Sequence, residues 1–183
     1  MIYILIGVLV LIVIYVLATY NGFVRINNKV NEAFSTMDVY LKKRWDLIPN
    51  LVETVKGYAK HEKETLSEVI KLRNANANYD NLSPEEKIKA NEQLSKGIVK
   101  IMALSEAYPD LKANENFKDL SGQLTKVEDD IANSRKYYNG TVRDFNNKVQ
   151  MFPSNIIAML FGYKAKAMFE ANAEERENVK VSF

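Results

Sequence analysis

The side chains that could carry out chemistry are few, and their spacing fits none of the common catalytic or metal sites. The chain has 183 residues, no cysteine and a single histidine, His61. These counts exclude thiolate catalysis, disulfide bonds, iron–sulfur clusters and every metal site that needs two imidazoles. His61 and Glu62 begin like the helical motif of zinc proteases, but Thr65 stands where that motif needs its second histidine. We therefore predict a protein without enzymatic activity, with no catalytic residue, no cofactor and no metal ion.

Other arrangements that bind or transform ligands are equally poor matches. The seven glycines form neither a phosphate-binding loop nor the Gly-x-Ser-x-Gly elbow of hydrolases. The formal charge is +2, from 25 basic and 23 acidic side chains. Nucleic-acid binding usually needs a strongly basic surface, so we expect no nucleic-acid partner.

The first residues of the chain predict a membrane anchor. No charged side chain precedes Arg25, and 18 of the first 20 residues are hydrophobic. As a helix, residues 2–20 would span roughly 28 Å, close to the ~30 Å hydrocarbon core of a bilayer. The alternatives are a buried soluble helix and a cleaved signal peptide, which needs a basic start and a small-residue cleavage site. We predict that residues 2–20 remain in the lipid bilayer as a transmembrane helix.

Basic residues indicate the orientation of this span. Arg25 and Lys29 follow the apolar run, and only Met1 precedes it. The positive-inside rule places the side richer in Lys and Arg in the cytoplasm. We expect a single-pass protein of the cell membrane whose remaining residues lie in the cytoplasm.

The remaining residues have strong helical periodicity and almost no strand signal. Apolar positions step by three and four from Ile26 to Arg73, which predicts one long helix with a kink at Pro49. A polar loop over residues 74–82 then leads to Ser83, which precedes a proline and two glutamates as at a typical helix start.

Three further helices complete the predicted fold. The second helix ends near residue 108, and the third covers about residues 114–151. A short helix over residues 155–169 follows, with Ser154 as its candidate cap. The fold class is all-α, an N-terminal transmembrane helix followed by an elongated antiparallel bundle of long helices. The predicted domains are a transmembrane anchor (residues 1–20), a helical bundle domain (21–170) and a flexible C-terminal tail (171–183).

Charged residues on the apolar stripes are one candidate site. Arg44, Glu62 and Arg73 fall on the stripe of the first helix, and Glu128 and Arg135 lie beside that of the third. One interpretation is a set of ion pairs that fix the register of long helices. The other is a polar cluster that binds a small anionic ligand.

A second candidate surface lies towards the end of the chain. Residues 156–163 combine apolar bulk with lysines at positions 164 and 166. This pattern is typical of an interfacial helix or a docking surface, and also of a helix that folds over the open end of the bundle. The candidate interaction residues here are Ile157, Leu160, Phe161 and Tyr163.

Four blocks of the sequence resemble the LemA family, and together they cover essentially the whole chain. The longest block, residues 46–59, contains Asp46, Pro49 and Asn50 and is followed by His61 and Glu62. The blocks are DLIPNLVETVKGYA at 46–59, EAYPDLKAN at 106–114, RKYYN at 135–139, and FPSN at 152–155 continuing to FGY at 161–163.

The resemblance implies a bacterial membrane protein with one N-terminal span and a helical bundle, and with no established enzymatic activity. Genes of the family often lie near those of membrane metalloproteases or other envelope proteins, so such a protein is a candidate partner. We predict a membrane-anchored scaffold or adaptor that works through residues 46–50 and 156–163. Self-association through the apolar segment and a sensor that holds a small anionic ligand are the alternatives.

Overall fold

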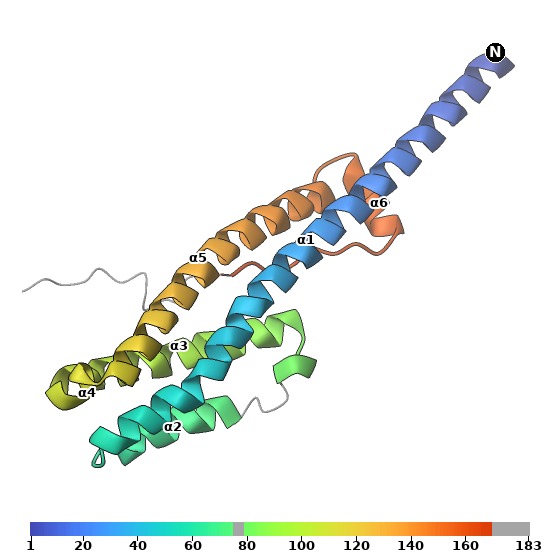
Figure 1. Ribbon diagram of the computed structural model, residues 1–183. Coiled ribbons are helices and arrows are strands. Elements are labelled where there is room, and N and C mark those ends of the chain that lie inside the picture. The colour runs from blue at the N-terminus through green and yellow to red at the C-terminus, as the bar shows by residue number, and fades with distance from the viewer. Residues whose placement is uncertain (75–78, 170–183) are drawn as a thin grey trace, which may run out of the picture. The chain divides into compact units, whose positions relative to one another are not determined.

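The protein is built from helices. A computed structural model describes residues 1–74 and 79–169, and neither range contains a strand (Figure 1). The all-α prediction is therefore confirmed. The predicted tail, residues 171–183, lies outside the described residues. In chain order the elements are α1 (Ile2–Tyr58), α2 (Lys63–Asn74), the 3₁₀ helix η1 (Tyr79–Asn81), α3 (Pro84–Ala107), α4 (Pro109–Ala113), α5 (Glu115–Gln150) and α6 (Ser154–Leu160).

The chain forms two compact units, and helices α1 and α5 contribute to both. The anchor unit comprises Met1–Val30 and the chain from Tyr138 onward, and the bundle unit comprises Asn31–Tyr137. This division follows packing, whereas the predicted boundary after residue 20 follows hydropathy. Each unit has a buried apolar core of its own.

Helix α1 continues without a break through the exposed Pro49 and ends at Tyr58. The N–H of Ala59 still donates to the carbonyl of Val55 (2.8 Å), and the N–H of Glu62 then donates to the carbonyl of Ala59 (3.1 Å) in a tight turn. Helix α2 runs back beside α1 (Figure 1). The prediction of one helix up to Arg73 is therefore wrong. A helical hairpin keeps its apolar stripe inside on both sides of the turn, so the spacing of apolar residues continues across it.

Helix α3 begins as the sequence predicts. The Ser83 hydroxyl accepts a hydrogen bond from the N–H of Glu86 (3.3 Å), and the Glu86 carboxylate accepts one from the N–H of Ser83 (2.9 Å). This reciprocal capping box satisfies two N–H groups that a helix start leaves free. The bond from the Ser83 N–H is also the main reason that the pKa of Glu86 lies below its usual value.

Helices α1, α2, α3, α4 and α5 all contribute to the core of the bundle unit. Helices α2 and α3 approach closely at Gly97, where a Cβ would lie 3.0 Å from a methyl group of Val69. Glycine at this position therefore allows the close contact. The large apolar side chains that are fully buried in this unit include Met37, Leu41, Ile48, Leu51, Leu94, Ile101, Leu111 and Ile131.

In the anchor unit, α5 ends at Gln150, as predicted to within one residue, but α6 is much shorter than predicted. Gly162 adopts φ +73°, and the N–H of Tyr163 donates to the carbonyl of Ala158 (2.9 Å). This is the Schellman motif, which ends a helix at a glycine in the left-handed conformation. The prediction of a helix up to residue 169 is wrong, and residues 163–169 form no regular helix.

Ser154 does not cap α6 as predicted. Its hydroxyl, which has one proton to donate, lies within hydrogen-bond distance of the carbonyls of Lys148 (2.7 Å) and Met151 (2.9 Å). It therefore satisfies a carbonyl group at the end of α5, one of those that a helix C-terminus leaves free.

The first part of α1 is a candidate membrane anchor. Its most apolar 18-residue stretch has a mean hydropathy of 2.9 and is only 6 % buried. Among the described residues, α1 is the one helix long and apolar enough to cross a membrane. The protein itself buries few of these apolar side chains, whereas a lipid bilayer would surround them.

Candidate functional site

Arg44 is fully buried in the bundle unit and joins three helices. Its Nη1 donates to the hydroxyl of Ser95 on α3 (2.8 Å) and to the carboxylate of Glu128 on α5 (2.9 Å). Its Nη2 donates to the backbone carbonyl (2.7 Å) and the side-chain oxygen (2.8 Å) of Asn91 on α3. Of the three guanidinium nitrogens of Arg44, Nε alone is buried without a hydrogen-bond partner among the described residues. Both terminal nitrogens are thus occupied, which supports the ion-pair interpretation for this residue.

The polar interior around Arg44 continues to Asp38 on α1. The Asn91 amide donates to the hydroxyl of Tyr79 (2.7 Å), which donates to one carboxylate oxygen of Asp38 (3.3 Å). Lys87 donates to the other oxygen (2.6 Å). Burial and the charge of Asp38 raise the pKa of Tyr79, so its phenol remains protonated. Trp45 stacks on Tyr79 with a centroid distance of 4.9 Å. These bonds form a connected network of the kind that stabilises a polar core.

The other charged residues of the stripes have different surroundings. Glu62 lies in the α1–α2 turn and accepts a hydrogen bond from the hydroxyl of Tyr108 (3.1 Å). Burial and this bond raise the pKa of Tyr108. Arg73, near the end of α2, and Arg135, on α5, are half-buried. The structure therefore joins Arg44 to Glu128 but gives Glu62 a separate partner.

Within residues 46–50 of α1, Asp46, Pro49 and Asn50 are accessible, whereas Ile48 is buried in the core. Asp46 pairs with Lys42 one turn earlier (2.7 Å), and both side chains are exposed. Pro49 and Asn50 are exposed as well. An exposed ion pair adds little stability, so these side chains are free to contact a partner.

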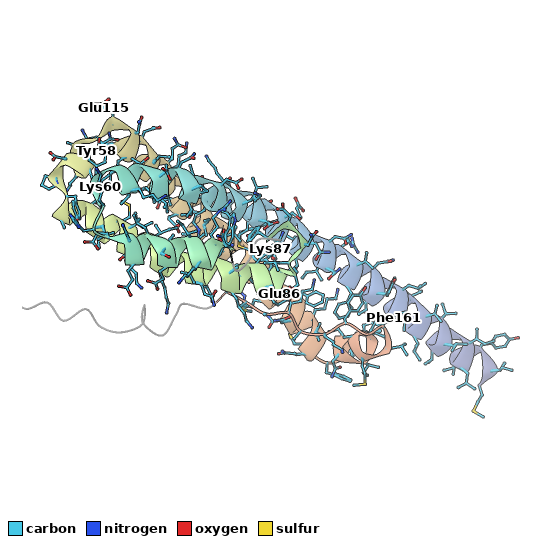
Figure 2. All side chains as sticks on the ribbon, turned by 90° about the horizontal axis from the view of Figure 1, so that it is seen from below. Tyr58, Lys60, Glu86, Lys87, Glu115 and Phe161 are labelled. Atoms are coloured by element: carbon cyan, nitrogen blue, oxygen red, sulfur yellow. The ribbon has the colours of Figure 1, made fainter. Side chains whose placement is uncertain are left out.

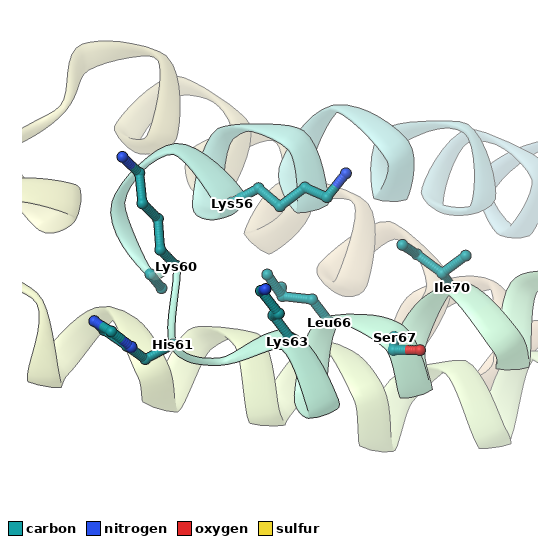
Figure 3. A pocket seen from close by; sticks show the side chains of 8 residues that line it. Lys56, Lys60, His61, Lys63, Leu66, Ser67 and Ile70 are labelled. Atoms are coloured by element: carbon teal, nitrogen blue, oxygen red, sulfur yellow. The ribbon is translucent and has the colours of Figure 1, made fainter.

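A groove of about 720 Å³ lies beside the α1–α2 turn, within the bundle unit. Its lining combines apolar side chains, such as Leu66 and Ile70, with the side chains of three lysines (Figure 3). Lys56 also reaches Glu53 at 3.4 Å, an exposed contact that holds it weakly. We call this the basic groove. It is lined by Lys56, Ala59, Lys60, His61, Lys63, Leu66, Ser67 and Ile70.

The sequence analysis did not identify the basic groove. Its three lysines are four and three residues apart, so they share one face of the predicted continuous helix as well. The groove beside them forms only because the chain reverses at the turn. Gly57, in the last turn of α1, is the signal that could have located the reversal.

The four apolar candidates of the anchor unit divide into two groups. Ile157 is buried, and Tyr163 stacks on Phe23 with a centroid distance of 4.8 Å. Leu160 and Phe161 are exposed, at 71 % and 47 %. Part of α6 therefore packs within the anchor unit, while Leu160 is exposed.

Two asparagines of α5 hold the segment 163–169 by its backbone. The Asn146 amide donates to the carbonyl of Lys166 (2.9 Å) and accepts from its N–H (2.8 Å). Asn139 makes the same pair of bonds with Phe169 (2.8 and 2.9 Å). Each amide thus pairs with the segment as a neighbouring strand would. The sequence analysis missed this clamp, although two asparagines seven residues apart lie on one face of a helix.

Comparison with known proteins shows the family of this chain. The model of the LemA family matches residues 33–183. The chain belongs to the LemA family. Similar proteins include Protein LemA of Metamycoplasma hominis, 29 % identical over 88 % of this chain and 74 % of that protein. Magnetosome protein MamQ of Magnetospirillum gryphiswaldense is 23 % identical over 88 % and 68 %. Magnetosome protein MamQ 2 of Paramagnetospirillum magneticum is 23 % identical over 84 % and 65 %.

Two sequence blocks that carry the LemA resemblance meet at one end of the bundle unit. Tyr58 and Glu62 belong to or follow the first block, and Tyr108 and Asn114 belong to the second. The Asn114 amide donates to the Tyr58 hydroxyl (2.8 Å), and the Tyr108 hydroxyl donates to Glu62. These bonds hold the turn that carries the basic groove.

Replacing Arg44 by leucine is expected to destabilise the bundle unit. The change leaves Asn91 and Glu128 without their donor, and removing one partner of such a pair costs about 3 kcal/mol. Denaturation of the detergent-solubilised chain, followed by fluorescence of the buried Trp45, measures this loss. Lys43→Leu, at an exposed neighbouring position, is the matched control and should stay within about 0.5 kcal/mol of the parent. Equal effects of the two changes would contradict a structural role for Arg44.

Replacing Asn146 by alanine is expected to release part of the segment 163–169. The change removes two hydrogen bonds worth about 1 kcal/mol each, and about 2 kcal/mol corresponds to roughly a thirtyfold increase in local opening. Trypsin should then cleave after Lys164 and Lys166 about thirtyfold faster, as followed by mass spectrometry. The exposed neighbour Asn147 provides the control, because Asn147→Ala should leave the cleavage rate unchanged. An unchanged rate in Asn146→Ala would show that the clamp is dispensable.

Proposed function

We propose that this LemA-family protein is a membrane-anchored adaptor without enzymatic activity, which holds an acidic segment of another membrane or envelope protein in its basic groove. One observation carries the proposal. The same helix, α1, supplies both an exposed apolar segment of membrane-spanning length and one wall of the basic groove. A membrane metalloprotease is one candidate partner, from the family resemblance.

The chemistry of the basic groove supports a partner of this kind. Lys56, Lys60 and Lys63 line the groove together with Leu66 and Ile70. Ammonium groups attract carboxylates and increase the rate of encounter, while an apolar lining accepts an aliphatic or aromatic side chain. A segment with acidic residues next to an apolar one therefore fits the groove in charge and polarity.

The residues around the apolar segment support a cytoplasmic bundle unit. Arg25 and Lys29 follow the span, and basic residues near the end of a span favour the cytoplasmic side. In this arrangement the basic groove faces cytoplasmic segments of neighbouring membrane proteins. The other predicted surface, residues 46–50, would then be available on the same side.

The sensor alternative has less support. Arg44, its main candidate, already uses both terminal nitrogens within the bundle unit. A small anion would have to compete with these bonds in the core. The accessible cations of the basic groove offer an anionic group an easier site.

Site-directed crosslinking tests the adaptor proposal. A photoreactive amino acid in place of the exposed Ser67 should crosslink, in intact cells, to an acidic segment of a membrane or envelope protein. Lys60→Glu combined with Lys63→Glu should reduce this crosslink about tenfold, because each charge reversal at the rim of an interface costs roughly 0.5–1 kcal/mol. Mass spectrometry of the crosslinked peptide identifies the segment.

A matched pair of substitutions controls for charge. Lys118→Glu combined with Lys126→Glu changes two exposed lysines of α5 and should leave the crosslink unchanged. A crosslinked segment without acidic residues, or equal loss with both pairs, would refute the groove as the binding site.

The orientation has a test of its own. Since the chain has no cysteine, Lys60→Cys introduces a single thiol in the bundle unit. A membrane-impermeant maleimide should label it only after the cells are permeabilised. Labelling of intact cells would place the bundle unit outside.

A further inference from the structure

The anchor unit contains a second long stretch without charge. Apart from the first 24 residues, the longest run without a charged side chain is the fifteen residues 149–163. This run includes all of α6, which is therefore apolar on more than its packed side. Ile157 and Ala158 face the interior of the unit. Six large apolar side chains of this run are about half exposed or more. Their exposed fractions are Met151 62 %, Phe152 79 %, Ile156 55 %, Met159 82 %, Leu160 71 % and Phe161 47 %.

This apolar surface begins where the membrane span ends. Helix α6 lies beside α1 in both views of the anchor unit (Figures 1 and 2). The ring of Phe161 contacts that of Tyr20, the last residue of the apolar run, with a centroid distance of 4.7 Å. One turn further along α1, Tyr163 stacks on Phe23. The exposed side of α6 is thus continuous with the apolar surface of the anchor.

Cations lie next to this surface, on the side away from the span. Arg25 is about 7 Å beyond Tyr20 along α1, which is the depth of lipid headgroups when Tyr20 lies at the membrane interface. Lys148 lies over the ring of Phe23, with its nitrogen 5.1 Å from the centroid. Partial burial, and then the charge of Arg25, lower the pKa of Lys148. An anionic lipid phosphate would relieve the repulsion between these two cations.

A shallow groove between α5 and α6 also combines apolar and polar side chains. It has a volume of about 490 Å³ and is lined by Asn155, Met159, Tyr163 and Lys164, among others. The side-chain oxygen of Asn155 is buried without a hydrogen-bond partner among the described residues. Apolar side chains, a lysine and an amide together suit a surface where acyl chains meet headgroups.

We propose that the exposed side of α6 and the α5–α6 turn inserts into the bilayer interface, as a second membrane contact beside the transmembrane helix. The proposal rests on the anchoring of residues 2–20 that the proposed function includes. Amphipathic helices of this kind bury their apolar side about 5–10 Å into the boundary between headgroups and acyl chains. The contact fixes the depth and the tilt of the anchor unit, since a span alone leaves both free.

The bilayer is a better occupant of this surface than a protein. A lipid surface adjoins the end of the anchor in any case, so α6 meets it without any further binding event. Bulky methionine and aromatic side chains near flanking lysines are the residues that the membrane interface accepts. A partner protein would have to displace lipid from the same place.

Fluorescence quenching measures the depth of α6. Because the natural chain has no cysteine, single thiols at Met159→Cys, Val99→Cys and Leu9→Cys can each carry an environment-sensitive dye. Val99 is the matched control, as an equally apolar residue of α3 that is 68 % exposed in the bundle unit. The full chain is reconstituted in vesicles of phosphatidylethanolamine and phosphatidylglycerol that contain doxyl lipids, and Trp45 fluorescence verifies its folding.

The expected result has three parts. The dye at position 159 is quenched at least about twofold more than the dye at 99, most strongly by a doxyl group near the headgroup. The dye at position 9 is quenched most strongly by a doxyl group deep in the acyl chains. Adding Leu160→Glu removes at least about half of the quenching at 159, whereas adding Val99→Glu leaves it unchanged.

Each other result has a distinct meaning. Quenching at position 9, together with equal and weak quenching at 159 and 99, would refute the second membrane contact and leave the anchor intact. Absence of quenching at position 9 would refute the anchor itself and hence the proposed function. If the dye at position 159 is shielded from quenching to a degree that rises with the number of chains per vesicle, a second copy covers this surface. That result would overturn the proposal.

Discussion

The burial of one positive charge constrains the bundle unit. A guanidinium without water is unfavourable by several kcal/mol unless hydrogen bonds and a counter-charge replace its hydration. Arg44 obtains them from Asn91, Ser95 and Glu128, which belong to two other helices. Sliding α3 or α5 by one turn along α1 would move these acceptors about 5 Å away. The register of the three helices therefore follows from a charge placed on the apolar stripe of α1.

The position of Glu128 makes this arrangement less costly. Its side chain is 42 % exposed, while that of Arg44 is fully buried. The carboxylate thus keeps part of its hydration, and Asn91 supplies two neutral acceptors in the interior. Arg44 is therefore the one member of this ion pair that loses its hydration completely. Its mostly neutral partners still specify the register of the three helices.

The sequence predicted those parts of the fold that local rules determine. The start of α3 depends on Ser83 and Glu86 alone, and α5 depends on an uninterrupted apolar stripe. The α1–α2 turn could not be predicted from that stripe, because a hairpin preserves the spacing and residues 59–62 contain no strong helix breaker. The end of α6 depends on Gly162, whose signal was present but was outweighed by the apolar residues around it.

The candidate sites show the same limit. Arg44 was identifiable as a charge on an apolar stripe, but Asn91 and Ser95 were not, since uncharged polar residues are common on exposed faces. The spacing of the three lysines already places them on one helix face, but the groove between them forms only once the chain reverses at the turn. The partners of Asn139 and Asn146 are backbone groups, and a backbone group has no sequence signal.

The two units use the same helices against different surroundings. In the bundle unit α1 buries a stripe, with Met37, Leu41 and Ile48 inside and charged residues outside. In the anchor unit the large apolar side chains of α1 are mostly exposed from Ile2 to Leu17, whereas Phe23 and Val30 are buried. The change thus occurs within one continuous helix. Such a helix is stable along its whole length only if apolar surroundings replace the missing core around its first part. The uncharged α6 lies beside this change in the anchor unit, and contact with lipid would bury its exposed apolar side chains. The pattern of burial along α1 and α6 is therefore itself an argument for a membrane surface at this depth.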